Sequence, residues 1–457
     1  MDDFRDNLIP HDAPRLVKAR GVDLYTYAKP IIATAKAQEL IATWKSLLAE
    51  PFKGITANGE VEKGLFHLAD EGLEIEPVVR AGNALLSALG EGERQRAQHA
   101  IDALEWRDWY NPEWPMNDNG LRLDYASPQA RMAVLELMRA SLGYDGYVKT
   151  NRCRSANLYL GELYDLRNIM NEWSYHFLLF GSPSLRGPWG WSLYGHHLAL
   201  NCFILGRQMV ISPTFMGAEP TIIDCGPHDS FRLFEKEENG GLELMRSLSP
   251  SLREQAITYK RLKDPAMPAG RWHVDDGRQL GAAYRDNRII PYEGISVSGF
   301  TSAQQQQVLN VVDAFIEYLP AGPRAARLQQ IASMLDRTYF SWIGGYGEED
   351  PFYYRVQSPV IMVEFDHHAG VWLTNAEPAK YHIHTVVRTP NGNDYGKDLL
   401  RQHYELSHQK GSPHVKQEKE HAGEGGDGHH GHHDESTPAH GHEHEHEHGG
   451  HSHVHEH

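Results

Sequence analysis

Two short segments near the end of the chain carry residue types that bind metals or transfer protons. The first spans residues 360–366 and the second spans residues 382–388. Side chains of an extended strand alternate between its two faces, so every second residue of each segment shares a face. The residues placed together in this way are Glu364 and Asp366 in the first segment and His382, His384 and Arg388 in the second.

Pairing of these segments as antiparallel neighbours would bring carboxylates and imidazoles to one surface, because opposed Cβ atoms lie about 4.5–5.5 Å apart. Neutral imidazole is a good ligand for zinc, nickel and iron. The His-x-His spacing therefore predicts a site for a divalent transition metal. A half-buried sheet whose histidines bond to solvent or to carboxylates explains the same spacing without a metal, and the sequence leaves both interpretations open.

A second histidine pair, His196 and His197, lies in residues 189–205, which we interpret as one strand. His197 shares a face with Asn201, whereas His196 shares its face with leucines. Adjacent histidines of one strand cannot both reach one centre unless a bulge intervenes, which the preceding glycine permits. The leading metal ligands are expected to be His197, His382 and His384, with His196 as a further candidate.

These residues suit hydrolysis by a metal-activated water. Glu364 or Asp366 would be a fourth ligand or the general base, and a divalent metal lowers the pKa of its bound water to about 7. The planar fork of Arg388 would hold a carboxylate or phosphate of the substrate. Glu219 is a further acid/base candidate. The sequence therefore predicts a metal-dependent hydrolase acting on a small polar molecule.

Three other interpretations stay open. Two histidines and one carboxylate also describe the facial triad of Fe(II) oxygenases. A metal-storage or metal-delivery protein would use its histidine-rich C-terminus and need the rest only as a scaffold. In a purely structural interpretation, the histidines and carboxylates only satisfy one another within the sheet.

The C-terminal residues 411–457 differ in composition from the rest of the chain. From His421 onward they hold 14 of the 29 histidines. Ten Asp and Glu against two Lys give this tail −8 of the net charge of −17. Such a polar sequence of low complexity is expected to be disordered and to bind transition-metal ions. Metal buffering or delivery, tolerated low complexity and an engineered tag remain alternatives.

Composition restricts the remaining functions. The chain of 457 residues is acidic and has no Lys/Arg stripe, which argues against nucleic acid as a partner. No apolar run reaches the roughly 18–20 residues of a membrane span, and the N-terminus lacks the pattern of a secretory signal. A cytoplasmic protein is therefore expected. Three scattered cysteines do not form a disulfide framework or a zinc module. The sequence does not indicate an oligomeric state.

Residues 1–410 contain enough regular patterns to predict an α+β fold with helices packed on a mainly antiparallel sheet. Ser127 reads as an N-cap, and Thr301 with Gln304 reads as a capping box. Helices are expected at residues 31–48, 91–106, 127–141, 155–180, 242–248, 250–259, 301–318 and 323–334. Hairpins are expected at residues 51–66 and 189–220, and three strands of a meander at residues 338–345, 352–366 and 380–390.

Several motifs together resemble a known family. They are Pro51-Phe-Lys-Gly-Ile-Thr, Gly195-His-His-Leu-Ala-Leu-Asn, Pro213-Thr-Phe-Met-Gly-Ala-Glu-Pro, Glu364-Phe-Asp and His382-Ile-His-Thr-Val-Val-Arg, followed by Asp394-Tyr-Gly. This set resembles the family catalogued as domain of unknown function 3500, over roughly residues 35–408. The resemblance implies no activity, so the functional expectation rests on the chemistry of the residues.

Overall fold

A computed structural model describes residues 3–224 and 230–409 of the chain. The predicted histidine-rich tail, residues 411–457, lies outside these described residues. Contacts group the chain into Met1–Glu405 and Leu406–His457, and the fold set out below is that of the first unit.

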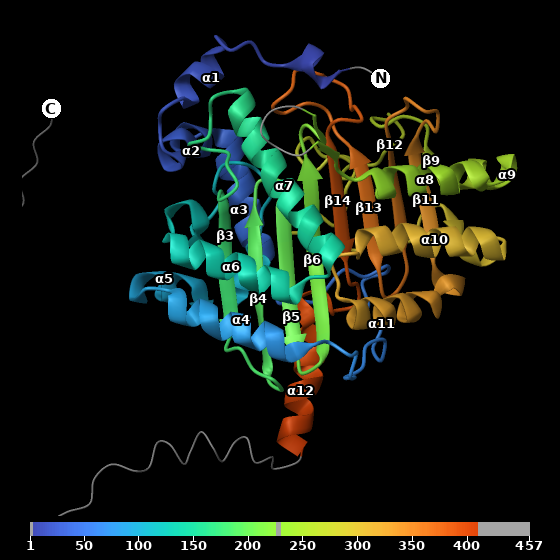
Figure 1. The fold of residues 1–457 in the computed structure, drawn as a ribbon. Coiled ribbons are helices and arrows are strands. Elements are labelled where there is room, and N and C mark those ends of the chain that lie inside the picture. Colours follow the sequence, from blue (N-terminus) through green and yellow to red (C-terminus); the bar gives the residue numbers. More distant parts are fainter. Residues whose placement is uncertain (1–2, 225–229, 410–457) are drawn as a thin grey trace, which may run out of the picture. The chain divides into compact units, whose positions relative to one another are not determined.

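One large sheet forms the centre of this unit (Figure 1). Its strands follow the order β1 (Gln98–His99), β3 (Tyr175–Gly181), β4 (Pro188–Gly195), β5 (Leu198–Leu205), β6 (Gln208–Ala218), β14 (Ile383–Arg388), β13 (Met362–His367), β12 (Phe352–Gln357), β11 (Tyr339–Gly344) and β10 (Ile295–Ser296). Strand β2 (Leu121–Arg122) pairs with β3, and β9 (Ile257–Tyr259) pairs with β11. Only the short pairings β1–β3 and β9–β11 are parallel within the described sheet. The predicted α+β class with a mainly antiparallel sheet is confirmed.

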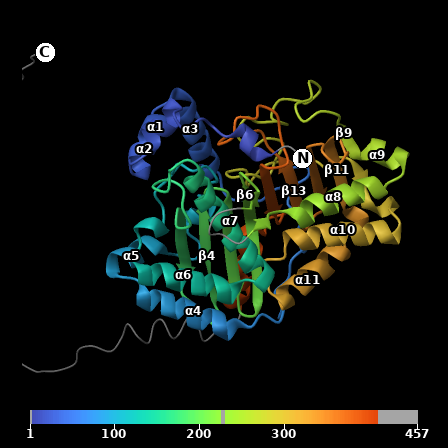
Figure 2. The ribbon, with the colours of Figure 1, turned by 45° about the horizontal axis from the view of Figure 1, so that its top comes forward.

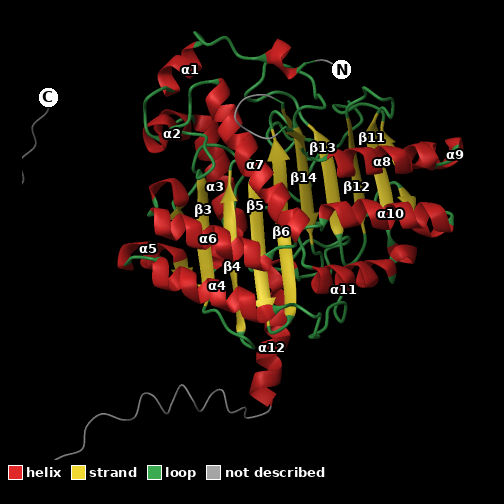
Figure 3. Ribbon diagram, in the orientation of Figure 1, coloured by secondary structure: helices red, strands yellow, loops and turns green. Residues whose placement is uncertain are grey.

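Helices cover one face of this sheet. The long ones are α4 (Ile75–Ala88), α6 (Pro128–Ser141), α7 (Tyr144–Leu163), α8 (Glu235–Ser247), α10 (Ser302–Phe315) and α11 (Ala321–Ala332). They lie in front of the strands in Figure 1, and the tilted view of Figure 2 keeps them on that side. Figure 3 shows the same layer in red against the yellow strands. The strands are nevertheless buried on both faces, so the core extends to the side of the sheet away from these helices.

The remaining helices and two short strands lie at the margins. The helices are α1 (Pro14–Ala19), α2 (Leu24–Ile32), α3 (Ala35–Ala49), α5 (Glu91–Ala97), α9 (Pro250–Ala256) and α12 (Lys397–Gln409), and β7 (Ile222–Ile223) pairs with β8 (Phe231–Arg232). Among the described residues, no helix combines the length and apolar composition needed to cross a bilayer.

Several local predictions are confirmed. Ser127 caps α6 by accepting from the backbone N–H of Ala130, and Thr301 and Gln304 form a reciprocal capping box at α10. Strands β5 and β6 form the hairpin that turns after Leu205. Strands β13 and β14 pair antiparallel, with Asp366 opposite His384.

Other local predictions are wrong. Residues 51–66 form no hairpin, because Thr56 pairs instead with Ile289 and the backbone of Ile55 bonds to Asn391. The helix expected at residues 155–180 ends at Leu163, and the apolar run that follows is β3. A short apolar run that is buried on both faces has no period that separates helix from strand. The helix expected at 91–106 ends at Ala97, where the chain enters β1.

Two predicted single strands each prove to be two. Residues 352–366 turn at Ser358, whose hydroxyl oxygen accepts from the backbone N–H groups of Val360 and Ile361. Residues 189–205 reverse at His196 and His197, which join β4 to β5. The histidine pair therefore occupies a tight turn that joins the ends of two internal strands, and not the middle of one strand.

The two faces of the meander have different coverings. Tyr354 of β12 packs against α8, where its hydroxyl donates to the carbonyl of Glu237 at 2.7 Å. On the opposite face, Glu364 and Asp366 of β13 accept hydrogen bonds from the segment Arg278–Gly281. The predicted working face of β13 and β14 therefore lies away from the helices, under this long connection.

Candidate metal centre

Three histidine side chains converge where β4 turns into β5 and β14 begins. Nε2 of His382 lies 3.0 Å from Nε2 of His384 and 3.3 Å from Nε2 of His197. All three residues are buried, and their ligand atoms lie within 4.8 Å of one another. A tetrahedral zinc ion with metal–nitrogen bonds of about 2.0–2.1 Å separates its nitrogen ligands by about 3.3 Å. The three nitrogens are therefore spaced as ligands of one small ion.

The turn between β4 and β5 positions His197. Its backbone has a left-handed φ of 58°, and its N–H donates to the carbonyl of Asn111 at 3.1 Å. Its own carbonyl accepts from Gly217 of β6 at 2.8 Å. His197 is therefore fixed from two sides and reaches histidines from a strand on the far side of β6.

Gly217 provides the space in which two of the rings meet. A Cβ at this position would lie 2.8 Å from Cδ2 of His384 and 3.1 Å from Cδ2 of His197. It would also lie 2.9 Å from the carbonyl oxygen of Ile383, so the obstacle includes backbone. The close approach of these imidazoles therefore depends on glycine at residue 217.

Hydrogen bonding fixes the tautomer of His382. Its Nδ1 lies 2.7 Å from the carbonyl oxygen of Ala369, which can only accept, so Nδ1 carries the proton and Nε2 a lone pair. Nδ1 of His384 is buried and has no partner among the described residues. The cluster therefore presents Nε2 of His382 as a ligand atom and leaves His384 incompletely satisfied.

The environment keeps the other two imidazoles neutral. Burial lowers the pKa of His197 and of His384 well below the usual range, and the neighbouring histidines act in the same direction. Metal binding requires the neutral form of histidine. The site therefore holds two of its ligands in the form that binds a metal at neutral pH.

A cavity of about 500 Å³ opens beside the triad. Its wall includes Leu40, Trp44, Asn111, Pro112, Glu113, Trp114, Lys263, Trp272, Asp275, Asp276, Gly277, Arg278, His368, Gly370 and Val371, together with the four histidines at 196, 197, 382 and 384. This volume lies within the roughly 300–1,000 Å³ of small-molecule sites. The wall is mostly apolar, with indole rings among its apolar groups and with histidines and carboxylates among its polar ones, so the cavity suits a small molecule that has both apolar and polar groups.

His368 lies beside the triad and against a carboxylate. Its ring centre is 3.9 Å from that of His384, and its Nε2 is 3.0 Å from Oδ2 of Asp366. Arg278 binds the same carboxylate through Nε at 2.6 Å and through its backbone N–H at 2.9 Å. Burial lowers the pKa of His368 to about 4, against the opposing effect of Asp366. Burial raises the pKa of Asp366, but Arg278 and His368 outweigh it and leave the pKa below its ordinary value.

The structure does not bring Glu364 or Arg388 to the triad. The Glu364 carboxylate accepts from the backbone N–H groups of Leu280 and Gly281 at 2.8 Å and from the Tyr353 hydroxyl at 2.7 Å. It therefore fastens a loop. The Arg388 guanidinium bonds to Asp286 and Asp394 in the interior and is not part of the cavity wall. Its donors are used within the fold, so it is not placed to hold a substrate.

Glu219 and His196 support the triad from outside. Glu219 accepts the backbone N–H groups of Val371, Trp372 and Leu373 at 2.8–3.0 Å, and its Oε2 is 3.8 Å from Nδ1 of His382. Nδ1 of His196 bonds to Asn157 at 2.8 Å, and its ring stacks on that of His197 at 4.1 Å. His196 lies outside the group that could hold one ion.

His368 and Arg278 were missed by the sequence analysis. The alternation that selected Glu364 and Asp366 extends by one further step to His368, so its position could have been found. Arg278 comes from a long connection of low periodicity, and no sequence signal placed it beside Asp366.

A family model described as "Protein of unknown function (DUF3500)" matches residues 71–397. The chain belongs to the DUF3500 family. The matched range contains the three triad histidines and His368, whereas Leu40, Trp44 and the Pro51 motif precede it. No curated protein and no solved structure matches the chain.

Proposed function

We propose that this DUF3500 protein is a metal-dependent hydrolase in which His197, His382 and His384 hold one divalent ion. The observation that carries the proposal is the convergence of the three imidazole nitrogens, at 3.0 and 3.3 Å, in the wall of a cavity. Catalytic zinc sites commonly combine three protein ligands with one open position. The ion would supply a water molecule activated for attack at neutral pH.

His368 is the general base in this proposal. It lies in the cavity wall, and its ring centre is 3.9 Å from that of His384. Asp366, which Arg278 holds, fixes its orientation. An imidazole held by a carboxylate is the usual arrangement of a base that takes a proton from a nucleophile. Asp366 thus acts through His368 and is not a ligand, which changes the role expected from the sequence.

The ligand set favours a hydrolase over an Fe(II) oxygenase. A facial triad needs a carboxylate as the third ligand. Glu219 is the acidic group near His382, but it approaches Nδ1, whereas the other histidines meet at Nε2. Zinc is therefore the first candidate, with nickel and iron as alternatives to be tested.

Metal content tests the site directly. We expect the full chain, loaded with zinc and passed over a chelating resin, to retain one tightly bound ion that His384→Leu loses. The substitution His444→Leu in the histidine-rich C-terminus is the matched control and should keep that ion. Retention of the same tight zinc by His384→Leu would refute the triad as the site, and it would favour the C-terminus as a metal store.

Activity tests the chemistry. Zinc-loaded protein should hydrolyse members of a panel of p-nitrophenyl esters and phosphoesters, with and without oxygen. His368→Phe should retain zinc and lower turnover by about 10²–10⁴, the usual contribution of a general base. Activity that requires oxygen would replace the hydrolase with the oxygenase alternative.

A further inference from the structure

A second cavity lies at the other end of β14 and has no part in the proposed metal chemistry. Its volume is about 540 Å³. The wall is mostly apolar and includes Leu65, Phe66, Met209, Ile211, Ile316, Leu319, Met334, Ile361, Val387 and Leu399. Thr389, just after β14, also lines it, five residues beyond His384. At about 3.3 Å per residue the two cavities are separated by roughly 16 Å along the strand.

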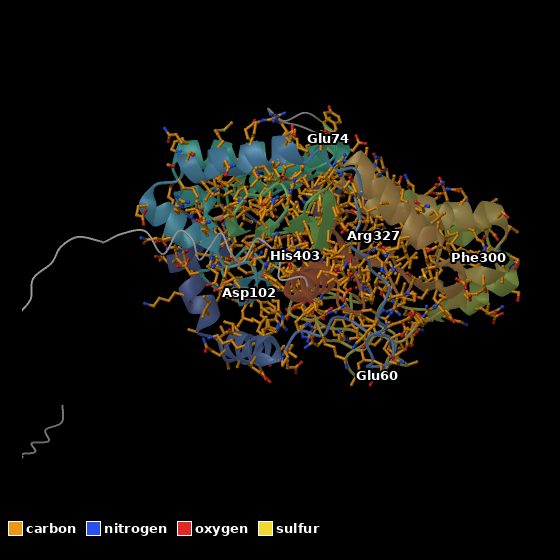
Figure 4. All side chains as sticks on the ribbon, turned by 90° about the horizontal axis from the view of Figure 1, so that it is seen from below. Glu60, Glu74, Asp102, Phe300, Arg327 and His403 are labelled. Atoms are coloured by element: carbon orange, nitrogen blue, oxygen red, sulfur yellow. The ribbon has the colours of Figure 1, made fainter. Side chains whose placement is uncertain are left out.

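Arg327 of α11, labelled in Figure 4, is the arginine among the residues that line this cavity. Its guanidinium donates to the carbonyl of Val360 at 2.6 Å, to the Thr389 hydroxyl at 3.1 Å and to Gln330 at 2.5 Å. A guanidinium has five N–H donors, so two donors make no hydrogen bond to the described residues. No carboxylate of those residues lies within 4.0 Å of it.

This arginine differs from the buried arginines near the metal centre. Arg278 and Arg388 each bond directly to a carboxylate. Arg327 does not, and burial lowers its pKa to about 10 although Tyr318, Glu71 and Asp394 act in the opposite direction. Arg327 is only partly buried, so it is accessible from the cavity that it lines. With donors to spare and no carboxylate within 4.0 Å among the described residues, it can pair with an anion that enters this cavity.

The neighbouring groups restrict the charge and shape of that anion. Glu71 lies in the same wall, where its carboxylate accepts from Gln208 at 2.9 Å and from the backbone of Met209 at 3.2 Å. A second negative charge on the ligand would meet this acidic group. The rest of the wall is more apolar than polar, with Asp70, Ser333 and Asn393 among its polar residues, which favours a ligand with a mainly apolar body.

We propose that this cavity binds a monocarboxylate with an aliphatic or aromatic body, its carboxylate paired with Arg327. The planar fork of arginine matches a carboxylate through two parallel hydrogen bonds. The alternative is that Arg327 only fastens α11 to the backbone at Val360 and Thr389. The two possibilities differ in whether the cavity takes up an anion.

Octanoate binding to the full chain tests the proposal, measured by titration calorimetry in the presence of a chelator. We expect saturable binding that Arg327→Met weakens at least tenfold. Arg324→Met is the matched control, because Arg324 lies on the same helix and pairs with Asp313. It should change the affinity less than twofold. Octylammonium, with the same chain and the opposite charge, should not compete.

A second variant keeps the test decisive if Arg327→Met fails to fold. Ala326→Trp places bulk in the cavity and retains the arginine, and it should also weaken octanoate at least tenfold. Absence of octanoate binding, equal binding of octylammonium, or unchanged binding in both variants would overturn the proposal. None of these results bears on zinc retention by the triad.

Discussion

The two ends of β14 hold buried polar groups of opposite character. At its start, His382 and His384 face His197, and Nδ1 of His384 has no partner among the described residues. At its end, Arg388 bonds to Asp286 at 2.6 Å, to Asp394 at 2.8 Å and to the carbonyl of Gly281 at 3.2 Å. One cluster is incomplete and borders a cavity, whereas the other is saturated and closed.

This difference separates a group kept for binding from a group kept for folding. Buried polar atoms are normally hydrogen-bonded, and an exception requires an explanation. In the cluster of Arg388, Asp286 and Asp394 every charge has a partner, so this cluster itself has no free group to bind a ligand. At the histidine end the ligand nitrogens of His197, His382 and His384 lie within 4.8 Å of one another, and Nδ1 of His384 has no partner among the described residues. That end has the ligand spacing to hold a metal ion.

The largest expected effect on the free energy of unfolding comes from breaking the saturated Arg388 cluster. Arg388→Met leaves Asp286 and Asp394 buried without their shared partner, which should lower the free energy of unfolding by about 3–5 kcal/mol. His384→Leu, in metal-free protein, should change it by less than about 1.5 kcal/mol, because a neutral and incompletely bonded ring is replaced by a side chain of similar volume. Urea denaturation with a chelator present measures both.

Arg401 forms ion pairs with Asp398 and Glu405 at the surface. These pairs supply the control for the comparison of Arg388→Met with His384→Leu. Arg401→Met should lower the free energy of unfolding by no more than about 1 kcal/mol. If His384→Leu proved as destabilising as Arg388→Met, the histidine end would be a structural cluster like its counterpart.

A smaller effect is expected from Glu219, whose carboxylate accepts several backbone hydrogen bonds and also lies close to His382. Its carboxylate orders the backbone at residues 371–373, next to the carbonyl of Ala369 that fixes the tautomer of His382. Glu219→Gln should therefore weaken zinc by about 10–100-fold, the usual consequence of disturbing a partner of a ligand. Zinc titration against a competing chelator measures this change.

Glu113→Gln is the matched control for Glu219→Gln. Glu113 also lies in the cavity wall, but it bonds to the Tyr27 hydroxyl at 2.8 Å and to none of the histidines. The zinc affinity of this variant should stay within about threefold of the wild type. An equal loss in both variants would show that Glu219 acts through general charge and not through the loop.

The sequence predicted the partners of the metal centre better than their surroundings. Alternation along the two segments placed Glu364 and Asp366 on one face and His382 and His384 on one face, and the structure adds the register that sets Asp366 opposite His384. It could not show that His196 and His197 form a turn, because a two-residue reversal leaves the apolar pattern on both sides intact. Nor could it show which of the predicted charged side chains already have hydrogen-bond partners within the fold. Glu364 and Arg388 are satisfied by Gly281 and Asp286, whose approach depends on tertiary packing and not on local periodicity.

The smallest expected effect concerns His176, a buried histidine that is saturated like Arg388 yet neutral like His197 and His384. Its Nδ1 donates to the carbonyl of Asn119 at 2.8 Å, and Nε2 accepts from Arg122 at 3.3 Å. Burial, together with Arg122, lowers the pKa of His176 to about 3, so below its ordinary value of 6.5 only the unfolded chain takes up the proton. Its contribution to stability is therefore complete above pH 6.5 and is lost as the pH falls from 6.5 toward 3. At pH 5.5 the loss is about 1.4 kcal/mol relative to pH 7.5.

Urea denaturation at the two pH values should show that His176→Asn removes this part of the pH dependence. An unchanged difference between the two pH values would mean that the folded protein protonates His176, and that a saturated imidazole in this fold is not held neutral.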